Sequence, residues 1–156
     1  MNEGQQKGRM PALFVAHGSP MNIIEHNTFT EALQELPRTI PRPAGIVVLS
    51  AHWQTQGTQV TATRHPRTIH DFMGFPDELY RIGYPCPGSP ELAARVQQAL
   101  GSEVATLDAE RGLDHGAWSV LLHMYPAAYT PVVEISLDMM LTPQERIELG
   151  SRLTAL

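Results

Sequence analysis

The sequence contains very little cysteine and lysine. Among its 156 residues there is one cysteine, Cys86, and one lysine, Lys7. A single cysteine excludes a disulfide framework and a cysteine zinc site, and we interpret Cys86, which lies between two prolines, as an incidental thiol. The absence of any lysine or arginine cluster and a formal net charge of -5 argue against a nucleic-acid or anionic-membrane surface.

Long apolar runs and the motifs of several enzyme classes are also missing. No apolar stretch approaches the length of a membrane span, and the first ten residues lack the apolar region of a signal peptide. We therefore expect a cytoplasmic protein. Neither a GxGxxG nor a Walker loop is present, and there is no GxSxG elbow or HExxH motif. Nucleotide binding and serine hydrolysis thus have no motif support.

Two short apolar stretches, each followed by a histidine, organise the chain. Residues 46–49 form an unbroken apolar run, which predicts a central strand over residues 45–50 that is buried on both faces and precedes His52. Residues 13–16 repeat this design before His17. Ligands bind at the carboxyl ends of strands in open α/β sheets, and neutral imidazole binds zinc and iron. His17 and His52 therefore predict a metal site that needs a further ligand; the alternative is a pair of core histidines hydrogen-bonded to backbone.

The rest of the pattern predicts an α/β fold with a mostly parallel central sheet flanked by helices. Further strands are expected at residues 59–63 (short and more exposed), 103–107 and 132–137. Helix signals stand at 28–31, 89–90 and 142–145, and a short helix is expected at 117–124. The first helix, between the strands at 13–16 and 45–50, would complete a βαβ unit.

The predicted domain organisation is a disordered extension over residues 1–10 and a single, incomplete α/β catalytic domain over residues 11–156. The last helix remains in helical register to residue 156, without a glycine cap or a proline. We therefore expect the chain to be truncated at its C-terminus, the amino-terminal part of a longer protein. The alternative is a terminal helix that docks on the sheet.

Two other segments contain residues that can carry chemistry. His115 lies in a glycine-flanked loop beside Asp114, where it can act as an acid or base or cap the following helix. His70, Asp71 and Phe72 belong to a long proline- and aromatic-rich segment, residues 64–88, which can form a pocket wall; a turn anchored by Asp71 is the alternative.

Glu134 interrupts an apolar strand. It lies on a half-exposed face, which strand alternation favours, or it is a carboxylate ligand. The remaining histidines, His26, His65 and His123, are interpreted as structural or surface residues.

Five segments together resemble one known family. They are residues 13–22 (LFVAHGSPMN), 50–53 (SAHW), 68–76 (TIHDFMGFP), 84–90 (YPCPGSP) and 114–118 (DHGAW). In this order they resemble the DOPA-dioxygenase type of class III extradiol ring-cleavage dioxygenases, related to the LigB subunit of protocatechuate 4,5-dioxygenase. The resemblance runs from about residue 11 to the end of the chain.

The resemblance implies a LigB-like α/β fold with a non-haem metal, Fe(II) or Zn(II), bound by His17 and His52. It makes His115 the catalytic acid or base and puts His70 at the substrate pocket, where Phe72, Phe75 and Trp53 can stack on a ring. The family's remaining ligands are histidines in later motifs, and this chain ends before them.

The function expected of the intact protein is oxygen-dependent opening of a catechol-type ring, with a DOPA- or caffeate-like substrate. The expected partners are this small molecule and O2, with no nucleic acid and no membrane. Two alternatives are a metal-dependent hydrolase and a non-catalytic metal-binding protein.

Overall fold

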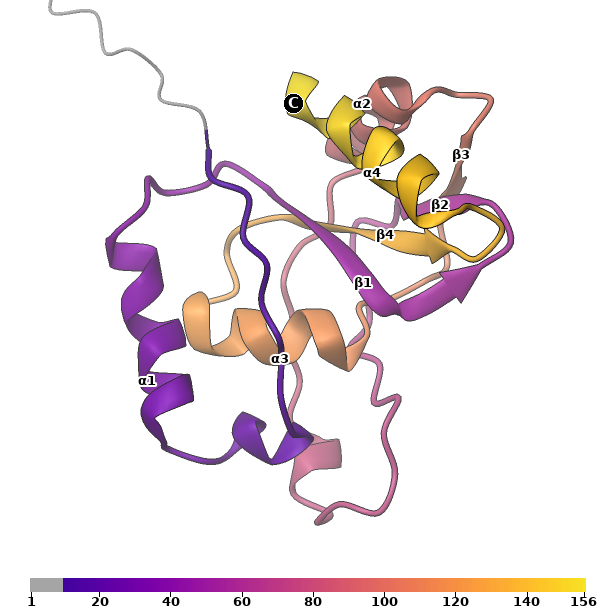
Figure 1. Ribbon diagram of the computed structural model, residues 1–156. Coiled ribbons are helices and arrows are strands. Elements are labelled where there is room, and N and C mark those ends of the chain that lie inside the picture. The colour runs from indigo at the N-terminus through magenta and orange to yellow at the C-terminus, as the bar shows by residue number, and fades with distance from the viewer. Residues whose placement is uncertain (1–9) are drawn as a thin grey trace, which may run out of the picture.

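A four-stranded mixed sheet forms the centre of the protein (Figure 1). The structure, a computed structural model, describes residues 10–156. The strands are β1 (Ile46–Thr55), β2 (Thr58–Thr61), β3 (Ala105–Asp108) and β4 (Val132–Asp138), in the order β1-β4-β2-β3. β1 and β4 are parallel, as are β2 and β3, whereas β2 meets β4 in antiparallel orientation. The predicted α/β fold with a mostly parallel sheet is confirmed.

Helices cover both faces of this sheet. They are α1 (Thr28–Glu35), α2 (Pro90–Leu100), α3 (His115–Met124) and α4 (Pro143–Arg152). α2 and α4 pack with Val133 and Ile135 of β4 on one face. α3 covers the opposite face through Trp118 and Leu121, and α1 packs on the outer side of α3 (Figure 1). Consecutive residues of β4 thus serve two cores, because side chains alternate along a strand.

Local capping signals place three of the helices. Ser89 caps α2, and Thr142 forms the expected capping box with Glu145 at the start of α4. The box of α1 begins one residue earlier than expected, since the side chain of Asn27 accepts hydrogen bonds from the backbone N–H groups of residues 29 and 30. α4 ends at Arg152 and is followed by a short 3-10 turn, so the predicted continuous helix to residue 156 is replaced by two elements.

The predicted strand at residues 13–16 is wrong. This segment has no strand pairing in the structure, and Leu13 and Phe14 expose their side chains to solvent. A strand needs a partner for its backbone N–H and C=O groups, and none of the described strands pairs with this segment. The expected βαβ unit across α1 is therefore absent from the described structure.

Two other strands differ from expectation in their position. β1, predicted as a central strand, lies at the edge of the sheet and exposes Leu49. It also continues to Thr55, so that His52 lies within the strand and not beyond its end. β2, predicted as more exposed, is almost entirely buried because it lies between β3 and β4. Apolar composition alone did not reveal which strands have neighbours on both sides.

The long segment over residues 64–88 is tied to the start of α3. Thr68 and Leu113 form an isolated parallel bridge, and the N–H of Ile69 donates to the carbonyl oxygen of Leu113 at 2.8 Å. Beyond this bridge Phe72 and Tyr84 enter the core that contains Trp118. The segment is thus an ordered wall against α3.

Two further expectations from the sequence concern the first ten residues and the absence of a membrane span. The predicted disordered extension at residues 1–10 falls, apart from Met10, outside the described residues. Across residues 10–156, no helix combines the length and apolarity that a bilayer crossing requires.

Removing the hydroxyl of Tyr84 should lower the stability of the protein modestly. Tyr84 is buried, and its hydroxyl donates to the carbonyl oxygen of Tyr125 at 3.0 Å. Tyr84→Phe should reduce the free energy of unfolding by about 1 kcal/mol, the usual size for such a bond. Urea denaturation measures this change. Tyr129→Phe, at a 77% exposed residue, is the matched control, and an equal loss in both variants would contradict the role of the bond.

Candidate metal centre

Three histidines from distant parts of the chain meet at one point. They are His17 of the extended segment, His52 of β1 and His115 at the first position of α3. Their ring centroids lie 4.3–4.9 Å apart, and one ligand atom from each falls within 4.8 Å of the others. The Nε2 atoms of His17 and His52 are 2.8 Å apart. Within residues 10–156, these three histidines are the group of possible ligands close enough together to hold one metal ion.

An irregularity in β1 directs His52 toward the cluster. Ser50 pairs with Ser136 of β4, but the next paired residue of β1 is Gln54, so the residues between them bulge out of register. Bulges turn side chains that a regular strand would place elsewhere, and they occur often beside functional sites. The backbone N–H of His52 donates to the hydroxyl of Ser50 at 3.2 Å.

His17 is positioned by the turn that follows it. Gly18 adopts φ +68°, a left-handed conformation that favours glycine. A Cβ atom on Gly18 would lie 2.6 Å from the side-chain nitrogen of Asn22. That nitrogen donates to the carbonyl oxygen of His17 at 3.2 Å, so the absence of a side chain at residue 18 allows the bond.

His115 is held at the amino terminus of α3. Asp114 is the N-cap of this helix, because its side chain accepts the N–H of Ala117 at 3.2 Å. The alternative in which His115 itself caps the helix is therefore wrong. Gly116 allows close approach of β1, since a Cβ there would lie 2.6 Å from Cδ2 of His52.

Asp71 joins two of the three histidines, and sequence reasoning did not assign it to the site. Its Oδ1 atom accepts both the backbone N–H and the ring Nδ1–H of His115, each at 2.8 Å. Its Oδ2 atom lies 3.6 Å from Nδ1 of His52. The hydrogen bond between Asp71 and Nδ1 of His115 leaves Nε2 of that ring free for a metal or a substrate. The position of Asp71 next to His70 was the available sequence signal. Its partners in the structure, His52 and His115, are 19 and 44 residues away along the chain.

The electrostatics of the cluster favour a neutral imidazole at His17 and an ionised Asp71. Burial opposes ionisation of Asp71, but hydrogen bonds from the ring and the backbone of His115 outweigh it and lower the pKa of Asp71 to about 2. Burial, with the neighbouring rings of His115 and His52, lowers the pKa of His17 below its ordinary value. Neutral imidazole is the form that binds a metal ion.

The donor set fits a first-row transition metal. Two nitrogen ligands at about 2.1 Å from one ion can be at most about 4.2 Å apart, and the Nε2 atoms of His17 and His52 satisfy this limit. The side chain of His52 is 32% exposed, which leaves a path to solvent. The geometric condition for a shared ion, that these two rings face a common point, is therefore met.

The residues predicted to contact substrate differ in how close they lie to the cluster. The Phe72 ring lies 5.3 Å from the His115 ring and 5.6 Å from Phe75. His70 lies behind Phe72, with Nε2 2.8 Å from the carbonyl oxygen of Ile82. Trp53 is buried beneath the guanidinium of Arg111, and its ring makes no ring contact with the described histidines. Phe72 is therefore the aromatic side chain best placed beside the cluster.

Glu134 is fully buried, so the half-exposed position favoured by strand alternation is wrong. β4 has a helical layer on each face, and neither set of its alternating side chains reaches solvent. The carboxyl group faces the start of α3 and accepts the N–H of Asp114 at 3.1 Å. It belongs neither to the three-histidine cluster nor to the exposed surface.

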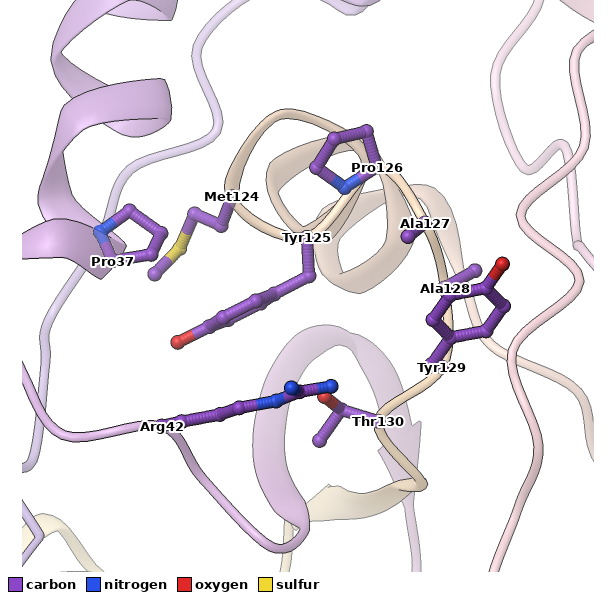
Figure 2. A pocket seen from close by; sticks show the side chains of 9 residues that line it. All are labelled: Pro37, Arg42, Met124, Tyr125, Pro126, Ala127, Ala128, Tyr129 and Thr130. Carbon is purple, nitrogen blue, oxygen red and sulfur yellow. The ribbon is translucent and has the colours of Figure 1, made fainter.

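A pocket of about 350 Å³ lies away from the histidines, at the carboxyl end of α3. Figure 2 shows Tyr125 and Arg42 extending along each other there, with Pro37 and Met124 at one end. Its lining is mostly apolar and contains none of the predicted site residues. We therefore place the chemistry at the histidine cluster and not at this pocket.

Replacing Asp71 by asparagine should remove a pH-dependent contribution to stability. The pKa of Asp71 is lowered in the folded protein, so its stabilising contribution is complete above the unfolded value of 3.8 and is lost as pH falls toward 2. Since the side chain is 26% exposed, we expect a difference of about 1 kcal/mol between wild type and Asp71→Asn near neutral pH.

The difference should shrink toward zero near pH 2, and urea denaturation at a series of pH values measures it. Asp77→Asn, at an exposed position of the same segment, is the control. A wild-type advantage that is equal at pH 2 and pH 7 would contradict the coupling of Asp71 to His115.

Comparison with known proteins adds independent information. A family profile described as "Catalytic LigB subunit of aromatic ring-opening dioxygenase" matches residues 10–156. A 4,5-DOPA dioxygenase extradiol of Escherichia coli (strain K12) is 53% identical over 149 residues, covering 95% of this chain and 55% of the relative. The protein of the same name from Beta vulgaris is 38% identical and covers 98% of this chain and 59% of the relative.

The fold is similar to a solved structure as well. The crystal structure of an uncharacterized protein from Escherichia coli K12 superimposes with a TM-score of 0.77 at 46% sequence identity. The alignment covers 95% of this chain and 55% of that chain. The chain therefore spans a little more than half the length of the relatives it matches.

Proposed function

Because the chain belongs to the family of catalytic LigB subunits of aromatic ring-opening dioxygenases, we propose that it provides the metal-binding part of an extradiol dioxygenase. The proposed reaction opens a catechol-type ring beside its two hydroxyl groups and consumes O2. The observation that carries this proposal is the convergence of His17, His52 and His115 next to the carboxylate of Asp71. A cytoplasmic location, expected from the sequence, stays part of the proposal.

His17 and His52 are the proposed ligands of a non-haem metal, Fe(II) or Zn(II). Iron(II), when bound, would align a catechol with O2 and supply the redox chemistry that activates both, whereas zinc(II), which has no redox chemistry, could only align them. The two imidazoles supply nitrogen donors, and the lowered pKa of His17 favours the neutral, metal-binding form of its ring. Asp71 orients the His52 ring from its Nδ1 side.

His115 is the proposed catalytic acid or base. Its Nδ1 is engaged by Asp71 at 2.8 Å, so Nε2 is the atom that can take a proton from a substrate hydroxyl or return it. The ring is buried, with 4% of the residue exposed, which excludes bulk water from the transfer. Asp71 fixes the orientation and tautomer of this ring, as a carboxylate does for a catalytic histidine in other enzymes.

A DOPA- or caffeate-like catechol is the proposed substrate. Phe72 stands edge-on to His115 at 5.3 Å between ring centroids, which suits contact with an aromatic ring held at the cluster. His70 and Phe75 flank Phe72 and complete the wall. Trp53 stays a predicted substrate contact, although its ring packs against Arg111 and makes no ring contact with the histidine cluster.

The test is anaerobic loading of the full-length protein with iron(II), followed by addition of DOPA or caffeate and oxygen. The expected result is oxygen uptake matched by a yellow semialdehyde product, with none in the metal-free protein. Metal binding by the full-length protein without oxygen uptake for any catechol would contradict the dioxygenase proposal. It would favour the non-catalytic metal-binding protein that was the alternative from sequence.

A metal-dependent hydrolase would give a different result. The zinc-loaded chain would then turn over an ester or amide in the absence of oxygen. Oxygen-dependent turnover only with iron therefore separates the two enzyme classes.

A further inference from the structure

The buried carboxyl group of Glu134 contacts the turn that carries His115. Glu134 lies in the middle of β4 with none of its surface exposed. Its Oε2 atom accepts the backbone N–H of Asp114 at 3.1 Å, and its own N–H donates to the hydroxyl of Thr61 on β2. Burial of a charged or polar group lowers the stability of the folded protein unless the group forms hydrogen bonds.

From Asp114 the network reaches two of the three histidines, His115 through the peptide chain and His52 through hydrogen bonds. Asp114 precedes His115 and caps α3. The position of the Asp114 backbone therefore determines the point from which the His115 side chain extends. Its Oδ1 atom also accepts the hydroxyl of Ser50 at 2.8 Å. That hydroxyl in turn accepts the backbone N–H of His52 at 3.2 Å. Glu134 is thus at the inner end of a network that reaches both β1 and α3.

Each of the two carboxyl groups of this network has one buried oxygen without a hydrogen-bond partner within residues 10–156. Oε1 of Glu134 and Oδ2 of Asp114 are buried and make no other hydrogen bond among the described residues. Arg111 places a guanidinium nitrogen 3.8 Å from Oδ2 of Asp114. Burial, together with a side-chain hydrogen bond to Asp114, raises the pKa of Glu134 to about 10. Glu134 is therefore the neutral partner, with an O–H that can donate to Asp114.

We propose that Glu134 is a positioning residue of the metal centre, which fixes His115 and His52 through Asp114 and Ser50 without contacting the metal. The inference rests on the metal site of the proposed function but not on ring cleavage. Glutamine can replace a neutral carboxylic acid, because its carbonyl oxygen accepts and its NH2 group donates as the acid does. An apolar residue of similar size can do neither.

The experiment is calorimetric titration of the chain with zinc ion alone. Glu134→Gln should bind zinc within about threefold of wild type, whereas Glu134→Leu should bind about 10–100-fold more weakly, the range for groups that orient metal ligands. Thr58→Val is the matched control, because the buried Thr58 hydroxyl makes no hydrogen bond among residues 10–156 and lies outside this network. Circular dichroism verifies that each variant is folded.

Zinc binding by Glu134→Leu equal to wild type would overturn the proposal while leaving the metal site intact. No zinc binding by wild type would overturn the metal site as well. Should Glu134→Leu fail to fold, Ser50→Ala tests the branch to His52 alone, with an expected loss of about tenfold in zinc affinity. Unchanged affinity in Ser50→Ala would then contradict the network.

Discussion

Replacing His52 by alanine should abolish tight metal binding. Nε2 of His52 lies 2.8 Å from Nε2 of His17, and the two atoms are the proposed ligands of one ion. Loss of either ring would leave only one of these two ligands. Groups that only orient a ligand already contribute about 10–100-fold to metal affinity, and we therefore expect a loss of more than about 100-fold for His52→Ala. His17→Ala should have the same effect. Titration with zinc and measurement of iron content after loading both report it.

The matched control for these variants is His65→Ala. His65 is exposed, and neither ring nitrogen is placed at the cluster. This variant should bind zinc as the wild type does. Wild-type affinity in both His17→Ala and His52→Ala, with the fold retained, would show that the two imidazoles are core or surface groups and not ligands.

Replacing His115 by alanine should stop turnover but retain the metal. General acid–base catalysis by one positioned side chain contributes about 10²–10⁴-fold, so we expect the rate of catechol consumption by the iron-loaded protein to fall by this factor. Zinc affinity should change far less than in His52→Ala. The reason is that His115 directs Nδ1 to Asp71, and its proposed role is proton transfer at Nε2.

The same variant can contradict this assignment. His115 belongs to the group of three whose ligand atoms lie within 4.8 Å, so its ring is close enough to be examined as a ligand. A loss of zinc affinity in His115→Ala as large as in His52→Ala would move His115 into the ligand set. Asp71→Asn then provides a second comparison, because it keeps the His115 ring but removes the charge that orients it.

Much of the site could be predicted from the sequence because several of its signals are local. A histidine after an apolar run, or beside glycine and aspartate, is visible within a few residues, and this indicated His17, His52 and His115. The role of Asp71 was not visible in the same way. Its partners His52 and His115 come from β1 and α3, and tertiary contacts, among them the bridge between Thr68 and Leu113, bring the segment of Asp71 beside α3.

The errors in the fold have a related cause. The apolar run at residues 13–16 matched a strand pattern, but a strand also needs a neighbour, and pairing is set by residues far away in the chain. For the same reason the run at residues 46–49 predicted a strand correctly but placed it in the centre of the sheet. Glu134 was expected at a half-exposed face because alternation does not show that helices cover both sides of β4.

The sequence by itself determined the helix starts at Ser89 and Thr142, the class of fold, and the residue types able to bind a metal. These properties depend on interactions within about one helical turn or on side-chain chemistry. The tertiary structure alone decided which strand lies at the edge, that Asp71 joins two histidines, and that Glu134 is buried beneath Asp114. Such features depend on contacts between segments that are distant along the chain, and local sequence patterns carry no record of those contacts.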